Sequence, residues 1–140
     1  MISFPNAKIN LGLNIIRKRN DGYHDLETFF YPVSLRDALE IIPNPNLADE
    51  HSGVNLHLAG KPVDGSPESN ICVKAWQLLK NDFPTLPAIE LHLLKAIPMG
   101  AGLGGGSADG SFTLKMLNEM FGLGLTHEAL ESYALKLGSD

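Results

Sequence analysis

The chain has 140 residues, a formal net charge of −5, 44% hydrophobic residues and 19% charged residues. This length allows one domain at most, and the hydrophobic content is enough for a packed core, so the composition excludes a disordered chain. The negative charge argues against a nucleic-acid-binding module, which normally carries a basic face.

Targeting and metal signals are missing from the sequence. No apolar run reaches the roughly 18 residues of a membrane span, and the N-terminus lacks the layout of a signal peptide. The lone Cys72 forms no internal disulfide, no Cys/His group has zinc-ligand spacing, and the histidines are scattered. We therefore expect a reducing, cytoplasmic setting without a membrane, nucleic-acid partner or protein-bound metal.

The periodicity of apolar residues predicts the elements in chain order. Alternation predicts strands first, over 8–16, 23–33, 38–42 and 54–58. Turn residues join the first two of these strands at Arg19–Gly22, and prolines and glycines make 60–69 a loop. Helical spacing then predicts helices over 71–79, 107–121 and 127–136, with a strand over 89–97 between the first two. The order is that of a mixed α+β fold.

Five glycines lie between Gly100 and Gly106, in the stretch IPMGAGLGGGSAD. They satisfy the dinucleotide pattern G-x-G-x-x-G, but the strand and acidic residue that should follow it are absent. No lysine precedes Ser107, which excludes a Walker A loop, and a protein-kinase glycine loop would join two strands. What remains is an anion cradle, in which backbone N–H groups converge at the positive end of the helix that is expected to begin near Ser107.

The segment Pro98–Ala108 resembles the phosphate-binding motif P-x-x-x-G-L-G-S-S-A of the galactokinase, homoserine, mevalonate and phosphomevalonate kinase superfamily. Three further stretches resemble one family within it, the 4-diphosphocytidyl-2-C-methyl-D-erythritol kinases. Pro5–Leu11 is similar to its P-A-K-x-N-L opening, Arg19–Thr28 to its R-x-D-G-Y-H-x-L-x-T segment, and Leu137–Asp140 to its L-G-A-D. This resemblance implies a mostly antiparallel mixed sheet backed by helices.

The resemblance also implies a reaction and a set of site residues. The γ-phosphoryl group of ATP, bound with Mg²⁺, would move to a hydroxyl of the cytidine-diphosphate-linked methylerythritol in the non-mevalonate isoprenoid pathway. The ATP phosphates would lie on the glycine loop, that is Pro98, Gly100, Gly102, Gly104, Gly105, Gly106 and Ser107. Asp140 would accept or orient the proton of the attacking hydroxyl, and Lys8 would keep Asp140 ionised.

The remaining carried-over residues concern the substrate and the nucleotide. Asn10 would hydrogen-bond near the reacting centre, and Tyr23 and His24 would form the cytosine site. Asn70 would contact the adenine, although it is equally suited to cap a helix, and Lys95 would lie near the nucleotide.

Members of that family are considerably longer than this chain. We therefore expect residues 1–140 to be an incomplete N-terminal ATP-phosphate-binding domain, with a C-terminal domain absent and little turnover on its own. Two alternatives stay open: another kinase of the superfamily, such as a mevalonate or homoserine kinase, or a non-catalytic nucleotide-binding module. The sequence leaves the oligomeric state open.

Overall fold

The structure, a computed structural model, describes residues 1–47 and 53–138. Its strands are β1 (Ile2–Ser3), β2 (Asn6–Lys18), β3 (His24–Arg36), β4 (Ala38–Pro43), β5 (Val54–Gly60) and β6 (Ile89–Lys95). Its helices are the short 3-10 helix η2 (Pro67–Ser69), α1 (Ile71–Asp82), α2 (Gly105–Phe121) and α3 (His127–Leu137). The α+β order expected from the sequence is confirmed.

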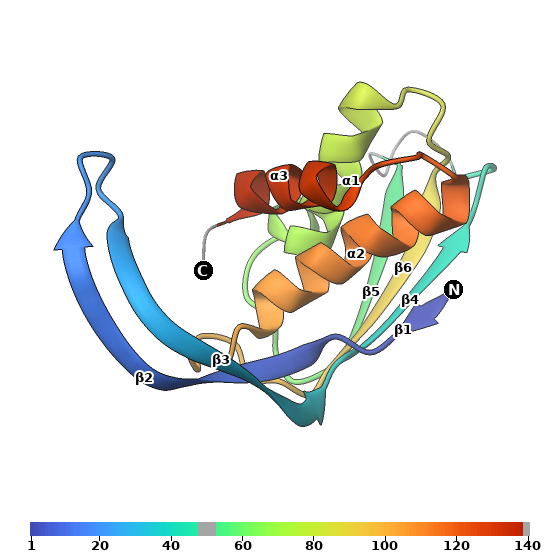
Figure 1. The fold of residues 1–140 in the computed structure, drawn as a ribbon. Coiled ribbons are helices and arrows are strands. Elements are labelled where there is room, and N and C mark those ends of the chain that lie inside the picture. Colours follow the sequence, from blue (N-terminus) through green and yellow to red (C-terminus); the bar gives the residue numbers. More distant parts are fainter. Residues whose placement is uncertain (48–52, 139–140) are drawn as a thin grey trace.

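Four strands form a mixed sheet in the order β1-β4-β6-β5, in which only β5 and β6 run parallel. The three α-helices lie together beside one face of this sheet (Figure 1). Alternate residues of β6, namely Ile89, Leu91 and Leu93, are buried in the core, where they meet the apolar face of α1 with Cys72, Trp76 and Leu79. The expected mostly antiparallel mixed sheet backed by helices is therefore confirmed.

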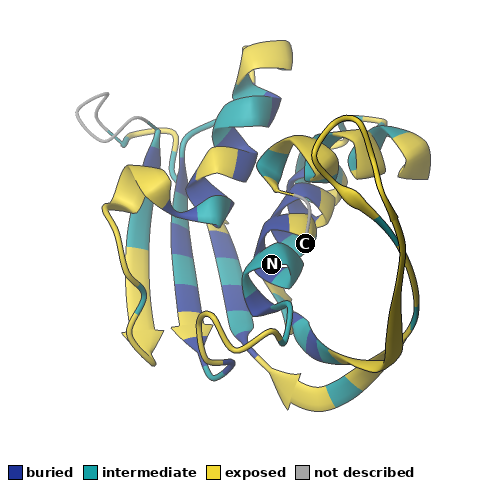
Figure 2. Ribbon diagram, turned by 90° about the vertical axis from the view of Figure 1, so that its left-hand side faces the viewer, coloured by how far each residue is buried: buried dark blue, intermediate teal, exposed yellow. Residues whose placement is uncertain are grey.

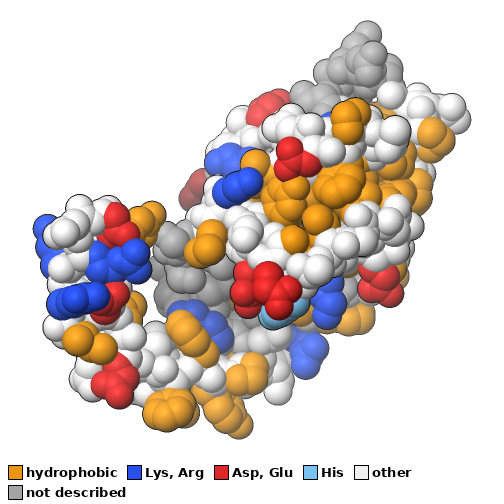
Figure 3. All heavy atoms as spheres, turned by 45° about the horizontal axis from the view of Figure 1, so that its top comes forward, with side chains coloured by type: hydrophobic (Ala, Val, Ile, Leu, Met, Phe, Trp, Pro, Cys, Tyr) orange, Lys and Arg blue, Asp and Glu red, His pale blue; other side chains and the backbone are white. Residues whose placement is uncertain are grey.

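Strands β2 and β3 form a separate two-stranded antiparallel ribbon that curves away from the body (Figure 1). The register shifts at three places along β2, and such bulges bend a ribbon. Most of the ribbon is exposed, and Phe29 is 78% exposed (Figure 2). Figure 3 shows hydrophobic side chains along the ribbon and charged ones at its tip, where Arg17 and Arg19 pair with Asp25 and Asp21.

The structure differs from the sequence-based elements in several places: the predicted loop 60–69 contains η2, and β2, β3 and α1 extend beyond their predicted bounds. The edge strand β1 is too short for periodicity to reveal it. Helix α2 begins at Gly105, two residues before Ser107. Strand β6 ends at Lys95 because the N–H groups of Ala96 and Ile97 donate to the Asp37 carboxylate, 2.6 and 2.8 Å away, rather than to a neighbouring strand. Within the described residues, no helix combines the length and apolarity needed to cross a membrane.

Candidate active site

The glycine loop brings several backbone donors to the start of α2. Gly100, Gly102 and Gly104 have φ angles of +70°, +72° and +70°, which L side chains rarely adopt, so the alternating glycines allow the chain to turn repeatedly. The first intrahelical bond runs from the N–H of Ala108 to the carbonyl of Gly104 at 3.0 Å. The N–H groups of the three residues between them therefore lack helical partners and present the positive end of the helix to an anion.

Lys8 on strand β2 lies against this loop although it is far away in the sequence. Its backbone N–H donates to the carbonyl of Leu103 at 2.9 Å, and its ammonium is 3.3 Å from the carbonyl oxygen of Gly102. The same ammonium donates to the Asn10 side chain at 2.8 Å and lies 5.2 Å from the centre of the Phe30 ring. The structure thus brings the expected residues Lys8 and Asn10 together beside the loop, while their chemical roles remain predictions.

A buried charge cluster lies beneath the loop. The Lys95 ammonium donates to Asp37 at 2.5 Å and to Asp109 at 2.7 Å, and all three side chains are almost fully buried. Asp37 precedes β4, Lys95 ends β6 and Asp109 lies in the first turns of α2, so the cluster ties three elements together at the base of the loop. Among the residues that the structure describes, none is a hydrogen-bond partner for the second oxygen of Asp109, Oδ1.

The two carboxyl groups of the cluster titrate differently. Burial raises the pKa of Asp109 to about 7, and the Lys95 ammonium offsets only part of this effect. Burial also opposes ionisation of Asp37, but the N–H groups of Ile97 and Ala96 and the Lys95 ammonium together hold its pKa below the usual value. Burial disfavours the charged form of Lys95 as well, yet its contacts with Asp109 and Asp37 outweigh this and raise its pKa. The cluster therefore contains a firm ion pair and one carboxyl group that changes charge near neutral pH.

The structure places Lys95 beneath the glycine loop. It is 2% exposed and its ammonium is held by two carboxylates, so it supports the loop from below. Its expected position near the nucleotide stays a prediction. Asn70 caps α1, because its side-chain oxygen accepts the N–H of Cys72 at 2.9 Å, and its contact with adenine stays a prediction.

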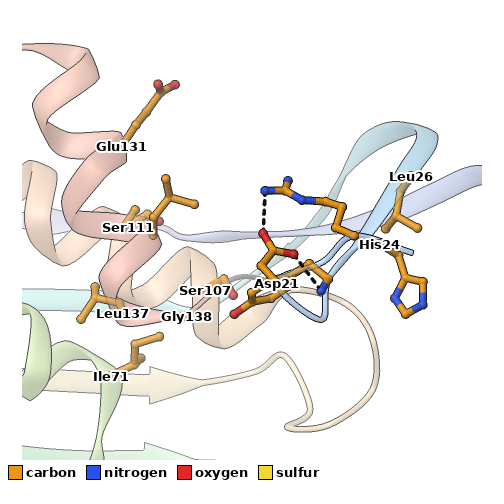
Figure 4. Close-up of a pocket in the computed structure, with 13 residues that line it drawn as sticks. Asp21, His24, Leu26, Ile71, Ser107, Ser111, Glu131, Leu137 and Gly138 are labelled. Carbon is orange, nitrogen blue, oxygen red and sulfur yellow. Dashed lines mark hydrogen bonds and ion pairs between the residues drawn. The ribbon is translucent and has the colours of Figure 1, made fainter. Parts of the chain in front are cut away.

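A cavity of about 860 Å³ separates the tip of the ribbon from the helices. Tyr23 and His24 line it from the ribbon, and Ser107 lines it from α2 (Figure 4). Leu137 and Gly138 at the end of α3 line it as well. The structure thus brings the expected cytosine residues and the end of the glycine loop to one cavity, whereas Asp140 lies outside the described residues.

Sequence reasoning missed Asp37 and Asp109. Asp109 had a signal, because it lies four residues after Gly105 and four before Thr113, on the face of α2 that the structure buries. A carboxylate on a buried face requires a partner, which should have pointed to a buried lysine. Asp37 had no comparable signal, since an aspartate just before a strand is ordinarily a solvated loop residue.

Comparison with known proteins gives a consistent result. The family described as GHMP kinases N terminal domain matches residues 70–140. The whole chain is 57% identical to a 4-diphosphocytidyl-2-C-methyl-D-erythritol kinase of Bacteroides fragilis and 49% identical to one of Cytophaga hutchinsonii, and covers 50% and 49% of those proteins. The chain thus spans about half the length of the curated relatives it matches.

Solved structures agree with this result. The crystal structure of a 4-(cytidine 5'-diphospho)-2C-methyl-D-erythritol kinase matches all of this chain over 47% of its own length, with a TM-score of 0.78 and 33% identity. A mevalonate kinase structure matches 98% of this chain over 46% of its own length, with a TM-score of 0.64 and 16% identity, which shows a shared fold alone. The chain belongs to the GHMP kinase family, and the part that matches is the N-terminal domain of those kinases.

Proposed function

We propose that this chain provides the ATP-phosphate site of a kinase that phosphorylates a hydroxyl of 4-diphosphocytidyl-2-C-methyl-D-erythritol, in the non-mevalonate isoprenoid pathway. The observation that carries the proposal is the contact of Lys8, whose ammonium also binds Asn10, with the glycine loop at the start of α2. An ammonium group beside a set of unpaired backbone N–H groups suits a transferring phosphoryl group. The names of the relatives at 57% and 49% identity supply the choice of acceptor.

The residues present fit a nucleotide phosphate chain. The loop residues from Pro98 to Gly102 are exposed, and an added Cβ would meet nothing within 4 Å at Gly100, Gly102 or Gly106, so the cradle is open. Its N–H groups would bind the phosphate oxygens, and the Ser107 hydroxyl would hold the magnesium ion that accompanies ATP. That ion would neutralise charge on the phosphates.

The cavity suits an acceptor that carries a base. The aromatic ring of Tyr23 offers a stacking face for cytosine, and His24 next to it offers polar contacts. Lys8 would draw the transferred group and favour the ionised form of a neighbouring carboxylate. Asp140 would be that carboxylate and would take the proton of the attacking hydroxyl.

The test is ADP release from Mg-ATP by the gene product at its natural length, with 4-diphosphocytidyl-methylerythritol, mevalonate and homoserine offered in parallel. We expect turnover only with the cytidine compound and its loss in Asp140→Asn. Lys8→Ala should lower kcat far more than it changes the affinity for the acceptor. His127→Ala is the matched control, because His127 is exposed on α3 and does not line the cavity.

Each alternative predicts a different outcome. Turnover with mevalonate or homoserine would keep the ATP loop but refute the cytosine site at Tyr23 and His24. ATP binding without turnover on any acceptor would favour a non-catalytic nucleotide-binding module and would refute the proposed reaction.

A further inference from the structure

The sheet face opposite the helices carries a group of side chains of the types that can bind metal ions. Strands β5 and β6 run parallel with His57 directly beside His92, and Glu90 lies two residues before His92 on the same face. His57 Nε2 is 2.7 Å from a Glu90 carboxylate oxygen, and the two imidazole rings stack with their centres 4.3 Å apart. The glycine loop and α2 belong to a different part of the molecule, so this group takes no part in the site described above.

The three side chains already lie close to the arrangement of a metal site. One ligand atom from each of His57, Glu90 and His92 can be chosen so that all three lie within 4.8 Å of one another. Zn²⁺ binds imidazole nitrogen and carboxylate oxygen at about 2.0–2.2 Å, so the ligand atoms of a site stand a little over 3 Å apart. The stacked rings must therefore tilt toward each other, and His57, whose side chain is 45% exposed, has room to turn.

The carboxylate of this group is oriented by a second contact. The side-chain amide of Asn44, just beyond β4, donates to one Glu90 oxygen at 2.7 Å and leaves the other oxygen facing His57. Outer contacts of this kind orient the ligands of metal sites.

We propose that His57, Glu90 and His92 form a surface site for a divalent transition-metal ion of the Zn²⁺ class. Two imidazoles and one carboxylate suit Zn²⁺, and such three-ligand sites keep a further position for water. Mg²⁺ prefers oxygen ligands in octahedral geometry, so this site is chemically distinct from one for the magnesium of Mg-ATP. Glu40 on β4, the register neighbour of His92, lies beside it on this face and adds negative charge.

The test is titration of the purified chain with ZnCl₂ by calorimetry, without nucleotide. We expect one Zn²⁺ per chain in the wild type. The Zn²⁺ affinity should fall at least tenfold in each of His57→Ala, His92→Ala and Asn44→Ala. Millimolar Mg²⁺ should not compete.

The control is His127→Ala, which removes an exposed histidine that pairs with Glu131 one helical turn away and should leave the affinity unchanged. Co²⁺ added in place of Zn²⁺ should give, in the wild type, the visible absorption spectrum of an ion held by a few nitrogen and oxygen ligands. This spectrum should be absent in His57→Ala. Unchanged Zn²⁺ affinity in the properly folded His57→Ala and His92→Ala variants would overturn the proposal. Because nucleotide and acceptor play no part, the outcome is independent of the proposed kinase function.

Discussion

Two neighbouring glycines at the start of α2 provide a sharp test of how the loop is packed. An added Cβ at Gly105 would lie 2.7 Å from the Cγ2 of Ile97, 3.0 Å from its Cβ and 3.4 Å from the Lys95 ammonium. An added Cβ at Gly106 would meet nothing within 4 Å. Neither glycine has a positive φ, so backbone strain does not separate the two substitutions. The difference between Gly105→Ala and Gly106→Ala therefore reports packing alone.

The size of the difference follows from two opposing effects. Alanine is favoured over glycine within a helix by about 1 kcal/mol, and by less in the first turn, where both substitutions lie. Overpacking of a filled site costs about 1–3 kcal/mol. Gly106→Ala should therefore be neutral or slightly stabilising, and Gly105→Ala should lower the free energy of unfolding by about 1–2 kcal/mol.

Urea unfolding measures this directly. For a protein of this size a difference of about 2 kcal/mol moves the midpoint by about 1 M. Gly105→Ala should also weaken Mg-ATP binding, because Ile97 and the cluster beneath the loop must shift, whereas Gly106→Ala leaves both in place. Equal unfolding midpoints for the two variants would refute the packing of α2 against Ile97.

Two further predictions concern stability. Lys95→Met leaves two carboxyl groups buried without a cation and should lower the free energy of unfolding by about 3–5 kcal/mol. The double variant Lys95→Met/Asp109→Leu should recover much of this loss. Thermal unfolding in the presence of urea compares the two variants, and no recovery in the double variant would contradict the ion-pair interpretation. Phe29→Ala should cost this chain less than about 1 kcal/mol because the ring is 78% exposed, whereas Leu91→Ala, fully buried, should cost about 2–5 kcal/mol. A large loss in Phe29→Ala would mean that the ribbon packs against another part of the chain.

The sequence predicted the local elements well because their signals are local. The hairpin of β2 and β3 follows from alternation and from the turn at Gly22. Thr126 is a residue type that favours helix caps, and it caps α3 by accepting the N–H of Ala129 at 3.2 Å. The approach of Lys8 to Gly102 joins residues 94 positions apart, so no local pattern in the sequence could reveal it.

Contacts set by strand register were beyond the sequence. His57 and His92 have no metal-ligand spacing along the chain, and they meet because β5 and β6 pair in parallel. The same holds for Asp37 and Lys95, which are 58 residues apart and meet where two strands approach the loop. A charged residue resembles a surface residue until its neighbours are known, so buried ionic groups are the part of a site that patterns hide most effectively.

The charge change of Asp109 should be visible in the pH dependence of stability. Its pKa is about 7 in the folded chain against a usual 3.8, so between these values the folded state binds more protons at this group than the unfolded state. Stability from this group therefore falls as the pH rises from about 4 to 7 and is level above that, with a loss of up to about 4 kcal/mol from a shift of about three pKa units. Asp37 acts with the opposite sign. Its pKa is lowered in the folded chain, so the stability it contributes is lost only as the pH falls below the pKa of an unfolded aspartate.

Urea unfolding of the wild type and Asp109→Asn at pH 5, 6, 7 and 8 separates the contribution of Asp109 from that of Asp37. The wild type should lose stability relative to the variant between pH 5 and 7, and parallel curves would refute the raised pKa of Asp109.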